Sequence, residues 1–137
     1  MIIERGALRF EARPGREFAD PLAGPATDPF SGAAVDFSVR IVRLSGDSVR
    51  WAHRHPQSVE LIHVIRGRGV LWEAGVERRF VEGDTALVPV GIPHATVPDP
   101  GSDIELICFF PHPNLDDNIE ELEDMIVSTG QRRAENG

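Results

Sequence analysis

His53-Arg54-His55-Pro56-Gln57-Ser58-Val59-Glu60 and the later Pro89-Val90-Gly91-Ile92-Pro93-His94 are the two stretches that decide how this chain folds. Residues two apart on a strand point to the same face, so His53 and His55 can hold one ion together. Glu60 supplies an oxygen ligand, and the bend before His94 can bring a third imidazole into the same space. Three imidazoles and one carboxylate leave open positions on an octahedral ion, as a catalytic metal requires. The set suits one divalent transition-metal ion per chain: iron, manganese, nickel, cobalt or zinc.

Sequence typical of β-strands surrounds both stretches. The segment 37–44 alternates apolar and polar residues, which is the period of a half-buried strand. Turns containing glycine or proline then separate further short strands, which we expect at 48–55, 59–65, 69–73, 77–81, 84–90, 94–97 and 104–110. Many short strands with no helical periodicity between them predict an antiparallel sandwich or barrel over residues 36–111.

The flanking segments are expected to be less regular. Residues 1–35 carry one short strand at 7–12 and then an extended arm or loop, because four prolines interrupt 13–34. This arm either covers the barrel of its own chain or crosses to a partner. Residues 112–137 place Ile119, Leu122 and Ile126 at near-helical spacing behind Asn114 and Asp116, either of which can cap a helix. We therefore expect a short C-terminal helix and a frayed tail at 131–137, all within one domain.

Charge and composition exclude several kinds of function. The 137-residue chain has a net charge of −8, and it contains neither lysine nor tyrosine. A lysine Schiff base, a phosphate-loop lysine and a tyrosine general acid are therefore excluded. The acidic balance argues against nucleic acid as a partner, and no apolar run approaches the ~20 residues of a membrane span. The N-terminus has no pattern of a secretory leader and Cys108 is the single cysteine, so we expect a cytoplasmic protein.

The two stretches resemble the paired motifs of the cupin superfamily, whose members are small antiparallel jelly-roll barrels. The first motif is G-x5-H-x-H-x3,4-E-x6-G, and the residues that fit it are His53, His55, Glu60 and Gly67. The first glycine of the motif is matched only approximately, because Gly46 lies one residue further from His53 than the motif requires. The second motif is G-x5-P-x-G-x2-H-x3-N, and the residues that fit it are Gly83, Pro89, Gly91 and His94. Pro98 replaces the final asparagine.

This resemblance covers residues 46–98 by motif and 36–111 as a fold. It implies an all-β, antiparallel double-stranded β-helix, the jelly-roll or cupin barrel. It also implies that the metal ligands lie inside the barrel and are His53, His55, Glu60 and His94. Cupin barrels often pair, so the resemblance implies a homodimer.

Alternation along the strands indicates which other side chains face the cavity. The expected pocket residues are Trp51, Ile62, Val64, Thr96 and Phe110, with plain core packing as the alternative for Trp51. Cys108 is expected to point inward as a small buried hydrophobe. His63 falls on the opposite face from Glu60, outside the barrel or at a dimer interface, and His112 is expected at the rim or surface. The arginines expected to be solvated are Arg54, Arg66 and Arg68, with one at the mouth for a substrate carboxylate as the alternative.

An open-sited metal in an apolar cavity favours a metal-dependent enzyme that acts on a small organic molecule. Within that class we favour non-haem iron dioxygenation. The alternative reactions are isomerisation, epimerisation or decarboxylation at a Lewis-acid ion, in which Glu60 leaves the ion and acts as a base. A different class of function is a non-catalytic cupin that binds a small molecule.

Overall fold

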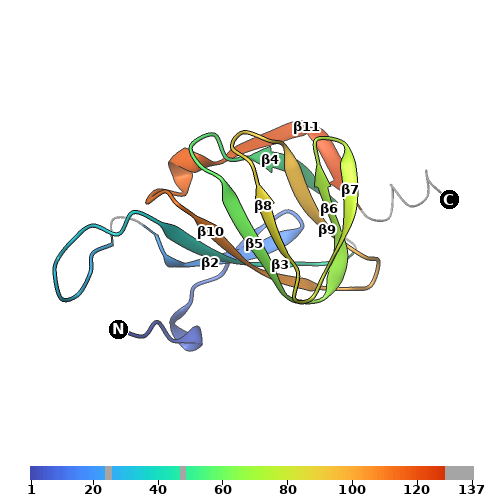
Figure 1. Cartoon of the computed structure of the whole chain (residues 1–137). Helices are drawn as coiled ribbons and strands as arrows, with labels where there is room; N and C mark the ends of the chain where they lie inside the picture. The colour runs from blue at the N-terminus through green and yellow to red at the C-terminus, as the bar shows by residue number, and fades with distance from the viewer. Residues whose placement is uncertain (24–25, 47–48, 129–137) are drawn as a thin grey trace.

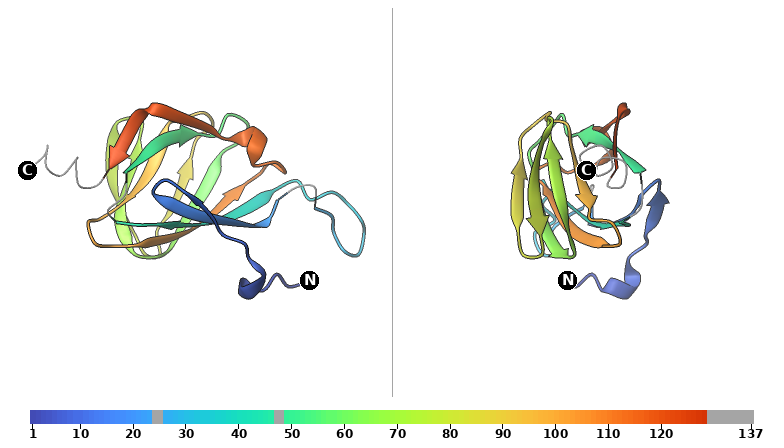
Figure 2. Two further views of the ribbon diagram at one scale, coloured as in Figure 1. Left: turned by 180° about the vertical axis from the view of Figure 1, so that it is seen from behind. Right: turned by 90° about the vertical axis from the view of Figure 1, so that its right-hand side faces the viewer.

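Two antiparallel β-sheets face each other and enclose the core (Figure 1). This arrangement comes from a computed structural model, which describes residues 1–23, 26–46 and 49–128. Views from behind and from the side show the strands of both sheets wrapped around one interior (Figure 2). Neighbouring strands are often distant in the sequence, which is typical of a jelly roll.

The six-stranded sheet has the order β1-β2-β3-β10-β5-β8. Its strands are β1 (Glu11–Arg13), β2 (Arg16–Leu22), β3 (Ser38–Leu44), β10 (Ile104–Phe110), β5 (Glu60–Arg66) and β8 (Thr85–Val88). The five-stranded sheet has the order β11-β4-β9-β6-β7. Its strands are β11 (Glu120–Ser128), β4 (Val49–Arg54), β9 (His94–Pro98), β6 (Arg68–Glu73) and β7 (Val76–Val81).

The expected all-β double-stranded β-helix is confirmed by this topology. Over the described residues the helical elements are two 3-10 turns, η1 (Arg5–Ala7) and η2 (Asp116–Asn118). Within the same part of the chain, no helix has the length and apolar character needed to cross a membrane.

The core forms because strand residues alternate between the interior and the solvent. In β5, Glu60, Ile62 and Val64 are buried, whereas Leu61 and Ile65 are exposed. The same alternation in the other strands builds one apolar cluster, which includes Val42, Leu44, Leu71, Phe80, Val88, Ile104, Leu106 and Phe110. The polar side chains of the two cupin motifs are buried beside this cluster.

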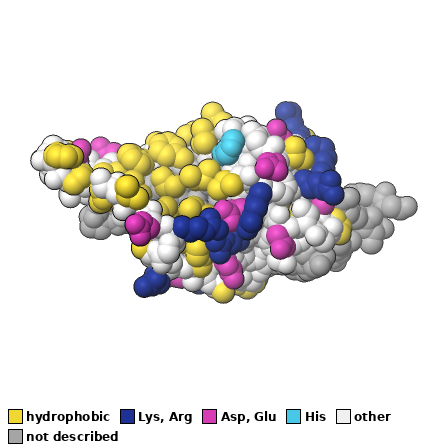
Figure 3. All heavy atoms as spheres, turned by 90° about the horizontal axis from the view of Figure 1, so that it is seen from below, with side chains coloured by type: hydrophobic (Ala, Val, Ile, Leu, Met, Phe, Trp, Pro, Cys, Tyr) yellow, Lys and Arg dark blue, Asp and Glu magenta, His cyan; other side chains and the backbone are white. Residues whose placement is uncertain are grey.

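The outer face of the six-stranded sheet is also apolar. The ladder pairs across β3, β10, β5 and β8 place four side chains in one row: Val39, Phe109, Leu61 and Leu87. Of these, Leu61 is 38% exposed and Leu87 is 64% exposed. His63 lies in the next row, where its Nδ1 is 2.8 Å from Thr85 Oγ1, so its predicted outward orientation is confirmed. A view from below shows a broad hydrophobic area on the surface (Figure 3).

The expectation of a loop over 13–34 is wrong for β2. This strand pairs with β3 and buries Phe18 and Ala19. Its register shifts between Ala19 and Leu22, and Pro21 falls at this irregularity, where a missing N–H disturbs the ladder least. The prolines therefore mark a bulge in a strand rather than the absence of one. The expected strand at 7–12 is replaced by η1 and the short β1, which pairs with β2.

The expected C-terminal helix is wrong. The segment 116–118 forms η2, and 120–128 forms β11, which pairs with β4. The spacing of Leu122 and Ile126 suggested a helix, but the register of β11 shifts between these two residues, so the spacing reflects a bulge in a strand. Pairing with β4 and the ion pair between Arg54 and Glu120, at 2.9 Å, override the local preference. The expected frayed tail at 131–137 lies outside the described residues.

Gly67, the last glycine of the first motif, connects β5 to β6 and has no room for a side chain. Its φ is +89°, and a Cβ there would collide with the backbone oxygen of Asp103. Gly83 has a φ of +90° but no atom within 4 Å of a Cβ. The two glycines therefore share a backbone conformation and differ in their surroundings.

Gly67→Ala should lower the free energy of unfolding more than Gly83→Ala does. Both alanines adopt a left-handed conformation that costs about 1–2 kcal/mol, but only Gly67→Ala must also displace the backbone at Asp103. Urea unfolding of the two variants measures the difference. Equal losses would show that the close approach at Gly67 does not matter to stability.

Candidate metal centre

Four metal-competent side chains meet inside the barrel. His53 lies in β4 and His55 just after it, Glu60 begins β5, and His94 begins β9. Their exposed fractions lie between 1% and 7%, and their ligand atoms all lie within 4.8 Å of one another. His53 and His94 are direct ladder partners of β4 and β9. The structure thus brings together the complete ligand set expected from the sequence.

Glu60 is the centre of this cluster. Its Oε1 lies 2.8 Å from Nε2 of His94 and 3.1 Å from Nε2 of His55. The rings of His53 and His94 are 4.4 Å apart between centroids. Burial alone would raise the pKa of Glu60, but its close contacts with His55 and His94 lower that pKa overall, far below its ordinary value. The carboxylate is therefore ionised, as a metal ligand must be.

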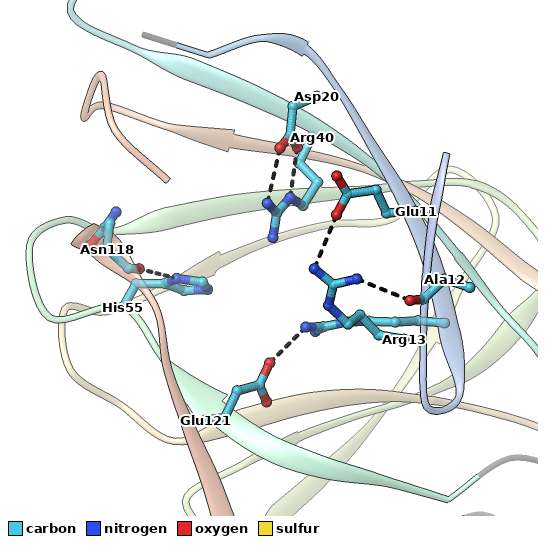
Figure 4. A network of polar contacts seen from close by, with 9 residues as sticks. Glu11, Ala12, Arg13, Asp20, Arg40, His55, Asn118 and Glu121 are labelled. Carbon is cyan, nitrogen blue, oxygen red and sulfur yellow. Dashed lines mark hydrogen bonds and ion pairs between the residues drawn. The ribbon is translucent and has the colours of Figure 1, made fainter. Parts of the chain in front are cut away.

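Hydrogen bonds on the far side of two rings fix their orientation. Nδ1 of His55 donates to the backbone oxygen of Asn118 at 2.7 Å (Figure 4), and Nδ1 of His94 donates to the backbone oxygen of Ile92 at 3.0 Å. In a neutral ring these bonds place the proton on Nδ1 and leave the lone pair of Nε2 for an ion, which is how metal-binding histidines are commonly held.

The residue Asn118 was not predicted as part of the site. Its side chain accepts from the Gln57 N–H at 2.8 Å and donates to Ser58 Oγ at 2.8 Å, so it ties η2 to the loop between His55 and Glu60. It is 1% exposed. Because the acidic segment around it suggested a helix, nothing in the local pattern indicated that this asparagine reaches the site.

The residues present fit a divalent transition-metal ion. His53 Nδ1 is a buried nitrogen without a hydrogen-bond partner, and buried polar atoms are rarely left without one. The pKa of His53 is lowered well below its ordinary value, first by burial and then by the nearby charges of His94 and Arg50. A neutral imidazole beside an ionised carboxylate is the protonation state that metal binding requires.

A cavity opens beside the cluster. Its apolar walls are Val42, Ile62, Leu106, Phe110 and Ile119, and Thr96 and Cys108 also line it. The Phe110 ring packs edge-on against His55, with centroids 4.7 Å apart. Of the expected pocket residues, Ile62, Thr96 and Phe110 thus line the cavity. Val64 packs in the core, and Trp51 lines a separate hollow nearby.

Three arginines that the sequence analysis did not single out also line the cavity: Arg16, Arg40 and Arg50. Regular alternation from His53 would put Arg50 on the opposite face of β4, yet both residues line the same cavity. The neighbouring β11 shifts register opposite Ala52 and Trp51, and β4 pairs with β9 only at His53 and His94. The extra residues of this shift lie in β11, between Leu122 and Ile126, and alternation fails in the part of β4 that faces them.

The remaining candidates lie as expected. Arg66 and Arg68 are 63% and 73% exposed, and Arg54 pairs with Glu120 at the surface. His112 bonds to Asn114 after the last strand of the six-stranded sheet. Cys108 is buried, and burial and the Glu60 carboxylate raise the pKa of its thiol well above the ordinary value.

The fold and the buried cluster define a jelly-roll barrel with a candidate metal centre. The sequence matches the cupin domain family over residues 40–110, more than half of the chain, so the protein belongs to the cupin family. The comparison with curated protein sequences finds no match.

Proteins whose solved structures share this fold are named for different reactions. Pac13 from Streptomyces, a nucleoside dehydratase, is 14% identical with a TM-score of 0.70, and the match covers 96% of each chain. The polyketide cyclase RemF from Streptomyces resistomycificus is 20% identical with a TM-score of 0.65, covering 80% of this chain and 78% of that chain. A variant of salicylate 1,2-dioxygenase from Pseudoaminobacter salicylatoxidans is 16% identical with a TM-score of 0.62, covering 80% of this chain but 30% of that chain. At these identities the similarity shows a shared fold alone.

Asn118→Ala should lower the free energy of unfolding by about 1–3 kcal/mol, because it removes the partner of the Gln57 N–H and of the Ser58 hydroxyl. It should also weaken metal binding by about ten-fold, since His55 loses a firmly placed acceptor. Urea unfolding and titration with Zn²⁺ measure the two effects. Asn114→Ala, the same change at an exposed position, is the control. An Asn118→Ala protein that equals wild type in both measurements would contradict the positioning role.

Proposed function

We propose that this cupin is a metal-dependent enzyme that acts on a small organic molecule. The observation that carries the proposal is the buried set of three imidazoles and one carboxylate, with ligand atoms within 4.8 Å of one another and facing a cavity. One divalent transition-metal ion per chain would be held by His53, His55, Glu60 and His94. When bound, the ion would supply open positions that activate dioxygen or polarise a substrate oxygen.

The protein's own groups would position the reactants. The hydrogen bonds to Asn118 and Ile92 hold two imidazoles in place before an ion or substrate arrives. Ile62 and Phe110 give the cavity an apolar wall that limits water. Such a wall suits a partly apolar or aromatic substrate.

The reaction we favour is dioxygenation, with iron as the metal. Apart from the four ligands, the titratable groups among the described residues that line the cavity are three arginines and Cys108. Arginine stays protonated near neutral pH, and the raised pKa of the Cys108 thiol keeps it protonated as well. A reaction that needs little acid–base work from side chains is therefore the best match.

A second candidate is a Lewis-acid isomerase, epimerase or decarboxylase. The observation that favours it is the position of Glu60, whose Oε1 lies within hydrogen-bonding distance of two imidazole nitrogens. Glu60 also lines the cavity, so its carboxylate would be in position to accept a proton from the substrate if it left the ion. A non-catalytic cupin that binds a small molecule would use the same cavity but would carry out no reaction there.

His53→Ala/His55→Ala should abolish the binding of about one metal ion per chain, because it removes half of the ligand set. Elemental analysis of untagged protein, with and without the paired change, measures this. His63→Ala/His112→Ala removes the same number of imidazoles away from the cavity and is the control. A wild-type protein that takes up none of Fe²⁺, Mn²⁺, Ni²⁺, Co²⁺ or Zn²⁺ would contradict the metal centre and leave the binding cupin as the function.

The metal found then separates the two reactions. Iron or manganese together with oxygen uptake on diols, diketones or catechol-like compounds would support dioxygenation. Zinc or nickel without oxygen uptake would support the Lewis-acid reactions.

We also propose that the protein is a homodimer that pairs through the outer face of the six-stranded sheet. The row formed by Val39, Phe109, Leu61 and Leu87 gives that face an apolar strip across four strands. Contiguous exposed apolar surface is typical of protein interfaces, and a two-fold dimer uses the same patch on both copies.

Leu61→Glu should convert the dimer to a monomer, because it places a charge in the middle of the apolar strip. Size-exclusion chromatography with light scattering measures the mass. Val76→Glu makes the same kind of change at a 57% exposed position on β7 of the other sheet, and it should leave the mass unchanged. A monomeric wild type, or a dimeric Leu61→Glu protein, would contradict this interface.

Two expectations from the sequence stay proposals. The partner is a small molecule rather than nucleic acid, in line with the net charge of −8. The cytoplasm stays the predicted location.

A further inference from the structure

Arg50 is a buried guanidinium that forms no ion pair with any of the described residues, although the charges of Glu121 and Glu60 act on it. It is 7% exposed, its Nη1 donates to the backbone oxygen of Thr96 at 3.1 Å, and its Nε has no hydrogen-bond partner. None of the ion pairs in the described part of the chain includes it. A buried charge without a partner is strongly destabilising, so its presence beside a cavity indicates a ligand that supplies the missing negative charge.

The other two arginines of the cavity are already paired. Arg16 Nη2 lies 2.6 Å from Glu121 Oε1, and Arg40 donates two hydrogen bonds to Asp20, at 2.7 and 3.0 Å (Figure 4). Both pairs join separate elements, because Arg16 bridges β2 to β11 and Arg40 bridges β3 to β2. The positive charge still available to a ligand is therefore that of Arg50.

Arg50 borders both the cavity of the metal centre and a second hollow. It lines the inner cavity together with His53, Glu60 and His94. Arg50 and Arg16 also line the outer hollow, whose other walls include Trp51 and Pro14. Arg50 therefore borders both spaces.

We propose that Arg50 binds a carboxylate of the substrate, so that the substrate of this cupin is a small organic acid. One unpaired guanidinium balances one negative charge, which is the charge of a carboxylate, and the planar fork of arginine matches its two oxygens. The apolar walls at Ile62 and Phe110 would contact the rest of the molecule. This inference rests on the proposed function, because it names the substrate class of the same cavity.

The test is an NMR titration of the zinc-loaded protein, and of the chelator-treated protein, with acetate, pyruvate and benzoate. Each acid is compared with its neutral amide. The two tryptophans report binding through their indole N–H signals, because Trp51 lines the hollow next to Arg50 whereas Trp72 packs in a separate cluster with Ala52 and Val97. The variants are Arg50→Gln, Arg50→Lys and, as the control, Arg79→Gln. Arg79 is 55% exposed and paired with Asp99.

At least one acid should shift the Trp51 signal and leave the Trp72 signal unchanged. The corresponding amide should bind more weakly than that acid, by about ten-fold or more. Arg50→Gln should weaken binding of the acid by about ten-fold or more, as expected for a hydrogen bond to a charged group, and should leave the amide unaffected. This dependence should persist after chelation, which separates it from a carboxylate on the ion. Arg50→Lys keeps the charge without the fork and should bind the acid more weakly than wild type; it decides the question if Arg50→Gln does not fold.

Any of four results would overturn the inference: no acid binds, acid and amide bind equally, the folded Arg50 variants bind the acid as wild type does, or inorganic phosphate binds in place of the acids. Metal content, measured on the same samples, separates the two proposals. A metal-binding protein that takes no acid loses only this inference. A protein that binds an acid through Arg50 but no metal loses the proposed enzyme and keeps the acid site.

Discussion

The buried carboxylate of Glu60 is the constraint on which the rest of the structure depends. An ionised carboxylate in an apolar interior is strongly unfavourable unless it is paired and hydrogen-bonded. Here the pairing comes from Nε2 of His94 at 2.8 Å and Nε2 of His55 at 3.1 Å. Glu60 belongs to the six-stranded sheet, whereas His94 begins a strand of the five-stranded sheet. Satisfying one charge therefore ties the two sheets of the barrel together at the site.

The segments that flank the barrel complete this centre. From the C-terminal side, Asn118 accepts the Nδ1–H of His55 and fixes the loop that leads to Glu60. From the N-terminal side, the β1–β2 hairpin brings Arg16 to the cavity. The Arg16–Glu121 pair joins the two flanks to each other. Neither flank belongs to the motifs that define the ligands, yet both determine how the ligands are held and which charges surround them.

The ligand set could be predicted from the sequence, whereas its surroundings could only be predicted in part. Alternation put Ile62, Val64 and Phe110 on the inner side and His63 on the outer face. In the structure Ile62 and Phe110 line the cavity, Val64 packs in the core, and His63 lies on the outer face. Trp51 was also expected at the cavity and lines a separate hollow, whereas Arg50, for which no prediction was made, lines the cavity. Both residues belong to β4, beside the register shift of β11. The spacing in the C-terminal segment predicted a helix for the same reason, since a bulge in β11 brings apolar residues to helical intervals.

The sequence by itself determined the family, the barrel and the four metal-competent residues. These follow from local rules: the period of two along a strand, the geometry of turns and the ligand chemistry of histidine and glutamate. Only the tertiary structure decided that Asn118 orients His55, that 120–128 adds a strand to the sheet, and that Arg50 is buried beside the ligands without an ion pair to a described residue. These features depend on contacts between residues far apart in the chain and on bulges that reverse strand parity, and neither leaves a local pattern in the sequence.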